Sequence, residues 1–186
     1  MISAGQDRTV RVFDLMTETL AQPFAGHSDR IRSISVCELD GRPIVVAAGN
    51  DRIVRMWDLL ADAAADGSIV AHNAWVRSAA LAQVAGRPVV MTGGDDGTIR
   101  VGDLAEGVTV APSFIGHTGW VYSVAAGRIE DTPVGVSGSD DRSMQVFDLA
   151  SGSGLSVLLE EGPRQPRRMP KKPGSKQKAR DGPTGW

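Results

Sequence analysis

The feature that most constrains this chain is a repeat of about 45 residues. A short turn motif that ends in Asp recurs along it, with the Asp at positions Asp7, Asp51, Asp96 and Asp141. The three histidines of the chain keep the same spacing, at His27, His72 and His117. Several residue types that stay in one register indicate a tandem array of one supersecondary unit. Any single motif therefore has to be interpreted as one copy of several.

Each unit divides into short segments that are typical of β-strands. In the second unit, an apolar run near 30–38 is followed by the continuous apolar run 44–48, which we expect to be buried on both faces. Residues 49–52 form the expected hairpin turn, in which Gly49 and the Asn-Asp pair after it would supply the unusual backbone angles. The next strand is expected over 53–57. Short strands between regular turn signals predict an all-β fold.

Paired residues mark the beginning and the end of each unit. Gly26-His27 and Gly116-His117 open two units, Trp57-Asp58 closes one, and Phe-Asp pairs at 13–14 and 147–148 close two others. This pattern resembles the WD-repeat family of β-propellers, in an incomplete array of about 3.75 repeats. The resemblance implies a partial β-propeller of four-stranded antiparallel blades. Three blades would be full, and the first would lack its innermost strand.

In the WD-repeat family, a His, the turn Asp, a Ser or Thr and a Trp of one unit form a hydrogen-bonded structural network. The resemblance implies that the members here are His27, Asp51, Trp57, His72, Thr92, Asp96, His117, Ser137 and Asp141. Ala47 replaces the hydroxyl of the second unit, and Gly102 replaces the Trp of the third. A His–Asp pair could also be a general base. Because a catalytic residue is needed only once, three copies at one period favour a structural role.

A second set of residues lies at the start of each innermost strand. The chain reads Arg30-Ile31-Arg32, Trp75-Val76-Arg77 and Trp120-Val121-Tyr122 after the three histidines. Alternation places the first and third residue of each triplet on one side, and the resemblance implies that this side, with the residue before each turn Asp, is where partners dock. The candidate partner-binding face consists of Arg30, Arg32, Asn50, Trp75, Arg77, Asp95, Trp120, Tyr122 and Asp140. Trp, Tyr and Arg dominate binding hot spots; the alternative is that the tryptophans pack between blades.

Charge divides the chain into two parts. Residues 1–161 carry 12 Arg, no Lys and 21 acidic residues, whereas 162–186 carry eight basic residues and one Asp. We expect 1–161 to form the array, with units near 1–25, 26–70, 71–115 and 116–161. The Pro- and Gly-rich segment 162–186 is expected to be a disordered basic tail. Such a tail is either inert or a contact for nucleic acid or an acidic protein.

The sequence predicts neither an active site nor a bound cofactor or metal. A single cysteine excludes an internal disulfide and a multi-Cys metal site. The glycine-rich stretch 93–98 lacks the lysine of a phosphate loop, and its two carboxylates would repel phosphate. The chain has neither an apolar run of membrane-spanning length nor a signal-peptide pattern, which predicts a cytoplasmic protein.

The favoured function is a non-catalytic scaffold for protein–protein interaction. Propellers close into rings of about 4–8 blades, so this array predicts a fragment or remnant of a larger propeller, a ring completed by self-association, or a strained small ring; we favour the fragment. The repeats also resemble bacterial WD-repeat arrays of multidomain signalling ATPases or kinases, which implies a sensor or regulatory portion as an alternative. Nucleic-acid binding through the tail is a further alternative. The identity of the partner is open.

Overall fold

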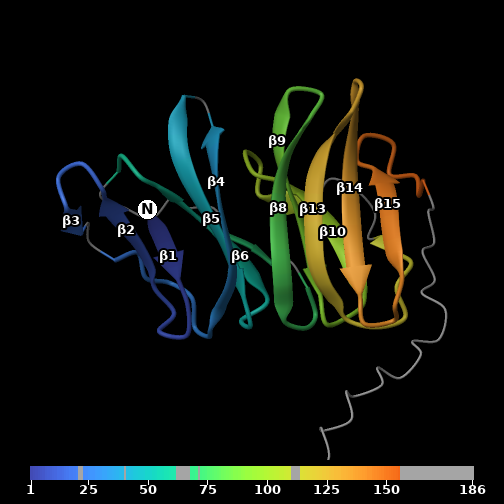
Figure 1. Cartoon of the computed structure of the whole chain (residues 1–186), viewed down its shortest axis with the longest axis horizontal. Helices are drawn as coiled ribbons and strands as arrows, with labels where there is room; N and C mark the ends of the chain where they lie inside the picture. The colour runs from blue at the N-terminus through green and yellow to red at the C-terminus, as the bar shows by residue number, and fades with distance from the viewer. Residues whose placement is uncertain (21–22, 40, 62–67, 71, 110–113, 156–186) are drawn as a thin grey trace, which may run out of the picture.

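The computed structural model describes residues 1–20, 23–39, 41–61, 68–70, 72–109 and 114–155. All regular elements in these residues are β-strands, and they form four antiparallel sheets in chain order. The sheets stand side by side in a row, with the first at the left of Figure 1 and the fourth at the right. The predicted all-β fold, a partial propeller of antiparallel blades, is thereby confirmed. The basic tail lies outside the described residues.

The strands of each sheet follow one another along the chain. The first sheet consists of β1 (Ile2–Ala4), β2 (Val10–Asp14) and β3 (Thr19–Leu20). The second consists of β4 (Ile31–Leu39), β5 (Arg42–Gly49), β6 (Ile53–Asp58) and β7 (Ser68–Val70). The third consists of β8 (Val76–Val84), β9 (Arg87–Gly94), β10 (Thr98–Asp103), β11 (Val108–Thr109) and β12 (Phe114–Ile115). The fourth consists of β13 (Val121–Ile129), β14 (Thr132–Ser139) and β15 (Met144–Asp148).

The sheets differ at their edges. The first sheet begins at β1, which is equivalent to β5, so the innermost strand is missing as the sequence predicts. In the third sheet, β11 and β12 both pair with β10 and together occupy its outer edge. In the fourth sheet, the outermost strand is represented within the described residues by the isolated bridge between Phe147 and Gly154.

The hairpin turn has the same form in all four sheets, and it corrects one expectation. The left-handed residue of the turn is Arg52, with a φ of 70°, rather than Gly49 or the Asn-Asp pair. Arg8, Gly97 and Arg142 occupy the same position at 67°, 73° and 70°. Gly49 is needed for a different reason, because a Cβ there would lie 2.3 Å from the carbonyl oxygen of Arg30.

The core lies between successive sheets. The run Ile44–Ala48 of β5 is at most 4% exposed, which confirms that this strand is buried on both faces. One face packs with Val10 of the first sheet and the other with Val76 of the third. Between the third and fourth sheets, Met91 packs with Val121 and its neighbours. A continuous apolar strand is therefore covered because each inner sheet has a neighbour on both sides.

Serine hydroxyls add a polar contact to each junction between complete innermost strands. Ser33 Oγ accepts the backbone N–H of Ala79 at 3.1 Å, and Ser78 Oγ accepts that of Val124 at 3.2 Å. Ser123 is the equivalent residue of the fourth sheet, and it is exposed. These bonds fix the register of each sheet against the next.

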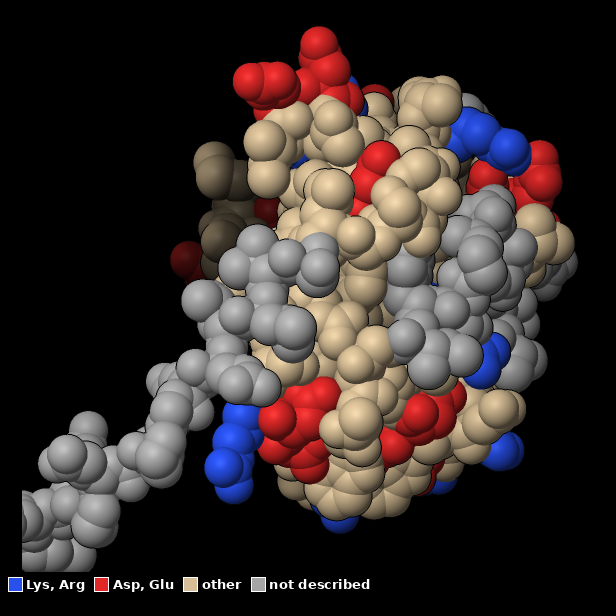
Figure 2. Space-filling view, turned by 90° about the vertical axis from the view of Figure 1, so that its right-hand side faces the viewer, with Lys and Arg blue, Asp and Glu red and all other residues tan. Residues whose placement is uncertain are grey.

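Among the described residues, no further sheet packs on the outer face of the fourth sheet. A Cβ at Gly93 would lie 2.5 Å from Cγ1 of Val121, whereas one at the equivalent Gly138 would meet nothing within 4 Å. Seen from this side, the described surface that is visible between an upper and a lower group of acidic residues is largely uncharged (Figure 2). Within the described part of the chain, no helix of membrane-spanning length and hydropathy is found.

Candidate partner-binding surface

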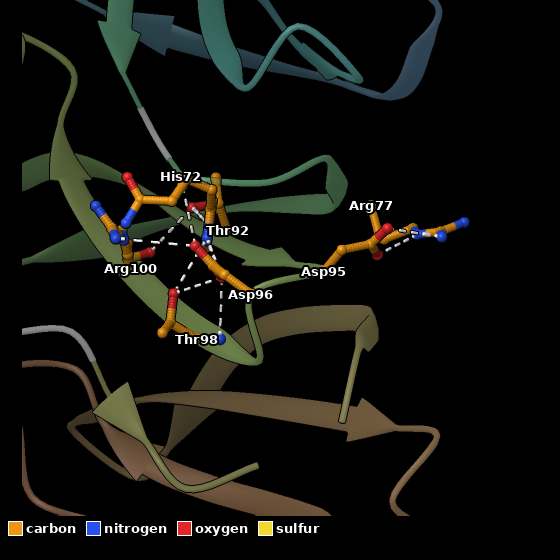
Figure 3. Close-up of polar contacts among 8 residues, drawn as sticks. His72, Arg77, Thr92, Asp95, Asp96, Thr98 and Arg100 are labelled. Atoms are coloured by element: carbon orange, nitrogen blue, oxygen red, sulfur yellow. Dashed lines mark hydrogen bonds and ion pairs between the residues drawn. The ribbon is translucent and has the colours of Figure 1, made fainter. Parts of the chain in front are cut away.

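The turn between β9 and β10 of the third sheet carries two adjacent aspartates, Asp95 and Asp96, which contact different residues (Figure 3). Asp96 points toward His72, whose Nδ1 lies 2.9 Å from Oδ1 of the carboxylate. The same oxygen accepts the hydroxyl of Thr98 at 2.7 Å and its backbone N–H at 3.1 Å. Asp95 points the other way, toward Arg77. Asp96 thus joins the loop before β8 to the turn between β9 and β10.

The same network is present in the second and fourth sheets with different completeness. His117 Nδ1 lies 3.0 Å from Asp141, and its Nε2 lies 2.8 Å from Ser137 Oγ. His27 Nδ1 lies 2.8 Å from Asp51, but its buried Nε2 has no hydrogen-bond partner among the described residues. Trp57 lies against the His27 ring, with 5.7 Å between the centroids. The second unit therefore keeps the aromatic contact and lacks the hydroxyl contact.

Burial sets the protonation state of two of these rings, those of His27 and His72. It lowers the pKa of His72 and of His27 from the ordinary 6.5, against the opposing effect of the adjacent aspartates. Burial also acts to raise the pKa of Asp96, but hydrogen bonds from Thr98 and His72 outweigh it, so that the pKa is lowered. At neutral pH the ring is therefore neutral and the carboxylate ionised. Nδ1 of His72 donates to Asp96, and Nε2 accepts from the hydroxyl of Thr92, which lies 2.9 Å away.

The second set of candidate residues is held together by the backbone of the turns. The N–H of Asn50 donates to the carbonyl of Arg30 at 2.9 Å, and that of Asp95 donates to Trp75 at the same distance. In the fourth sheet, the N–H of Asp140 donates to the carbonyl of Trp120 at 3.1 Å. Each bond places the residue before the turn Asp beside the start of the innermost strand. The nine candidate residues, Arg30, Arg32, Asn50, Trp75, Arg77, Asp95, Trp120, Tyr122 and Asp140, are called the partner face below.

One side-chain contact of the partner face occurs twice, in a neutral and a charged form. Arg32 Nε donates to Asn50 Oδ1 at 2.9 Å. At the equivalent positions of the third sheet, Arg77 donates to both carboxylate oxygens of Asp95, at 2.5 and 2.8 Å. This bidentate pair cancels the charge of Arg77 and fixes the plane of its guanidinium.

Aromatic rings from two sheets surround the guanidinium of Arg77. Its central carbon lies 5.5 Å from the ring centre of Trp75, 5.3 Å from that of Trp120 and 5.4 Å from that of Tyr122. Trp75 also contacts a second arginine, because the central carbon of the Arg32 guanidinium lies 5.8 Å from the same ring centre. Such cation–π contacts are attractive and hold the rings in fixed positions. The three aromatic residues nevertheless stay 44–48% exposed, so they are not packed away between sheets.

A hollow of about 500 Å³ lies beside this cluster. It is lined by Asn50, Arg52, Asn73, Ala74, Trp75, Arg77, Asp95 and Trp120. Arg52, Asn73 and Ala74 were not among the sequence-predicted residues. Arg52 directly follows the turn Asp and Asn73 directly follows a histidine, so their positions in the repeat were available as a signal.

The partner face offers planar aromatic surface and hydrogen-bonding groups. The geometry of the repeated His–Asp network indicates a structural role. One His–Asp pair occurs in each of three sheets with the same arrangement, as expected of a structural element that is repeated in every unit. Among the described residues, no three His, Cys, Asp or Glu side chains gather in a group that could hold a metal ion.

Comparison with known proteins agrees with this architecture. The family model of the WD domain, G-beta repeat (WD40), matches residues 18–58, 65–103 and 109–148. Each match spans the three inner strands of one sheet, preceded by strand residues from the outer edge of the sheet before it, and ends at the closing Asp. The comparison with curated proteins found no match to the chain. WD40 repeats are a protein-interaction kind of domain and are generally non-catalytic. The three matches together cover more than half of the chain, which therefore belongs to the WD40 repeat family.

Proposed function

We propose that this chain is a non-catalytic scaffold that binds a protein partner through the partner face. The observation that carries the proposal is the arrangement of Trp75, Trp120 and Tyr122 around a guanidinium that Asp95 holds in place. Half-exposed aromatic rings and arginines are the groups that contribute most at protein interfaces. Because their rotamers are already restrained, less conformational entropy is lost when a partner binds.

A displayed library of random dodecapeptides tests the proposal. The intact protein is immobilised, and the library is selected in parallel against the Trp75→Ala, Trp120→Ala double variant. We expect peptides that bind the wild type and lose at least about tenfold in affinity on the double variant, because aromatic anchors are each worth about 2 kcal/mol or more.

The matched control is Arg128→Ala. Arg128 lies near the far end of β13 from Trp120, and its side chain is 55% exposed. Binding should be unchanged in this variant. If the selected peptides bind the double variant as tightly as the wild type, the partner face is not the binding surface.

We also propose that the chain self-associates through the outer face of the fourth sheet, with a second copy as the occupant. The face carries the exposed Ser123 and the uncovered Gly138, at positions where the inner sheets receive a neighbour. The first sheet leaves Leu15, Met16 and Leu20 exposed at the other end of the row. End-to-end pairing of two copies would cover apolar surface at both ends.

Light scattering after size-exclusion chromatography tests this pairing. The monomer mass is 19.6 kDa, so a dimer has twice that mass. Gly138→Arg places a charged side chain on the free face and should yield a monomer. Ala105→Arg adds the same charge to an exposed turn of the third sheet and should leave the dimer intact. A wild-type protein that stays monomeric at all concentrations refutes the pairing.

A further inference from the structure

The partner face is not uniform in charge. At the second sheet, Arg30, Arg32 and Arg52 have no carboxylate within ion-pair distance in the described part of the chain. Arg32 donates to a neutral amide, and Arg52 is exposed and lines the hollow. The half-buried Asp29 directly precedes Arg30, and its Oδ1 accepts the backbone N–H of Arg30. Asp51 directly precedes Arg52, and its carboxylate lies on His27. This end of the face therefore presents uncompensated positive charge.

Charge changes across the face because the residues at several equivalent positions differ from one repeat to the next. The residue before the turn Asp is Asn50 in the second sheet, Asp95 in the third and Asp140 in the fourth. Asp95 is neutralised by Arg77. The fourth sheet has Tyr122 in place of that arginine, and Asp140 is exposed and forms no ion pair with the described residues. Arg142 occupies the position of Arg52 in this sheet and is also exposed without an ion pair among the described residues, two residues after Asp140. The face thus runs from three arginines at the second sheet, through a neutral and aromatic centre, to an end that carries both Asp140 and Arg142.

We propose, on the basis of the function proposed above, that the partner segment is an acidic peptide. Its carboxylates would lie on Arg32 and Arg52, and an adjacent bulky apolar side chain would lie in the hollow against Trp75 and Trp120. The guanidinium of Arg32 keeps donors free, because only its Nε is used by Asn50. A carboxylate can therefore be bound by charge-assisted hydrogen bonds without breaking an existing one.

The same surface is poorly suited to nucleic acid. A strand that stacked bases on Trp75 and Trp120 would carry its phosphates past Asp95 and Asp140. Phosphate binding needs positive charge along the whole path of the backbone, whereas three arginines without ion pairs gather at the second sheet and Arg142 at the fourth sheet is accompanied by Asp140. A short acidic segment needs positive charge at one point and matches this distribution better.

The test uses the dodecapeptide library and the intact protein again, with an Arg32→Ala, Arg52→Ala variant. We expect the peptides selected on the wild type to be enriched in Asp or Glu beside a Leu, Phe or Trp. Their affinity should fall roughly tenfold on the arginine variant and should also fall with added salt, because two exposed charge pairs are lost in the variant and salt screens such pairs. A single-stranded oligothymidine is titrated as the competing probe.

The outcomes separate the two proposals. Peptides that depend on Trp75 and Trp120 but show no acidic preference and no loss on the arginine variant would overturn the acidic-peptide inference and leave the proposed function standing. Peptides without any dependence on the tryptophans would overturn both. Oligothymidine binding that is lost on the arginine variant, without acidic peptides, would replace the peptide with a nucleic acid and would also overturn the inference.

Discussion

Replacing Ala47 by serine should stabilise this protein. His27 Nε2 is buried without a hydrogen-bond partner among the described residues, whereas the same atom of His72 lies 2.9 Å from Thr92 Oγ1. Ala47 stands at the position of that threonine in the preceding unit, and its side chain is fully buried. A serine hydroxyl would therefore emerge on the side of the strand where the ring nitrogen needs a donor.

The size of the effect follows from two terms. An intramolecular hydrogen bond contributes about 0.5–1.5 kcal/mol net, and the existing unsatisfied nitrogen removes about 1–3 kcal/mol that the new bond can recover in part. Against this, the added oxygen must fit among the packed side chains of Ile31 and Trp57. We expect the free energy of unfolding to rise by about 1 kcal/mol, which corresponds to about 3 °C in Tm for a chain of this length.

Urea unfolding followed by circular dichroism measures the change, and Ala48→Ser is the matched control. Ala48 is equally buried, but it packs into the apolar cluster between the second and third sheets, where the hydroxyl meets no histidine. Ala48→Ser should lower the free energy of unfolding by about 1–3 kcal/mol. If Ala47→Ser destabilises the protein as much as Ala48→Ser does, the empty position beside His27 is not a missing hydrogen bond.

Three further predictions concern the turns and the buried histidines. Asp96→Ala should lower the free energy of unfolding by about 1–3 kcal/mol, because His72 and Thr98 lose their acceptor; an unchanged Tm in a folded variant would contradict the structural role. Arg142→Gly should raise it by about 1 kcal/mol, because Arg142 holds a left-handed φ of 70° that glycine adopts without strain, and a lower Tm would speak against this. The folded chain lowers the pKa of His27 and His72 below 6.5, so the unfolded chain takes up protons first as the pH falls. The free energy of unfolding should therefore decrease as the pH falls from about 7 to about 5.5, by at most about 1.4 kcal/mol per pH unit for each histidine. Urea titrations at both ends of that range measure it, and equal or greater stability at the acidic end would refute the prediction.

The repeat made most of the fold predictable. A constant lag of 24 residues between a histidine and the turn Asp places the two at the same relative position in every unit, and the structure has them 2.8–3.0 Å apart in all three. The burial of 44–48 followed from its unbroken apolar character, because only a strand covered on both faces has that pattern. The missing innermost strand of the first sheet followed from the register of the repeat, in which the first unit enters at its second strand.

Other features depend on contacts between units, which a repeat pattern does not reveal. The rings around Arg77 come from the third and fourth sheets, and their approach depends on how far one sheet is rotated against the next. The hydroxyls of Thr98 and Ser143 donate to the turn Asp two residues earlier, and their equivalent positions in the repeat are the sequence signal for this contact. The left-handed residue was misplaced because arginine has no intrinsic preference for that conformation.

The serine bonds between sheets give the array a direction. Each innermost strand supplies an acceptor to the sheet that follows, as Ser33 and Ser78 do. An inner sheet therefore depends on two junctions, and the first and fourth sheets depend on one each. In such a linear array, stability is a sum of unit terms and junction terms. Amide hydrogens should consequently exchange earliest in β1–β3 and β13–β15, so that the array frays from its ends inward while the second and third sheets persist.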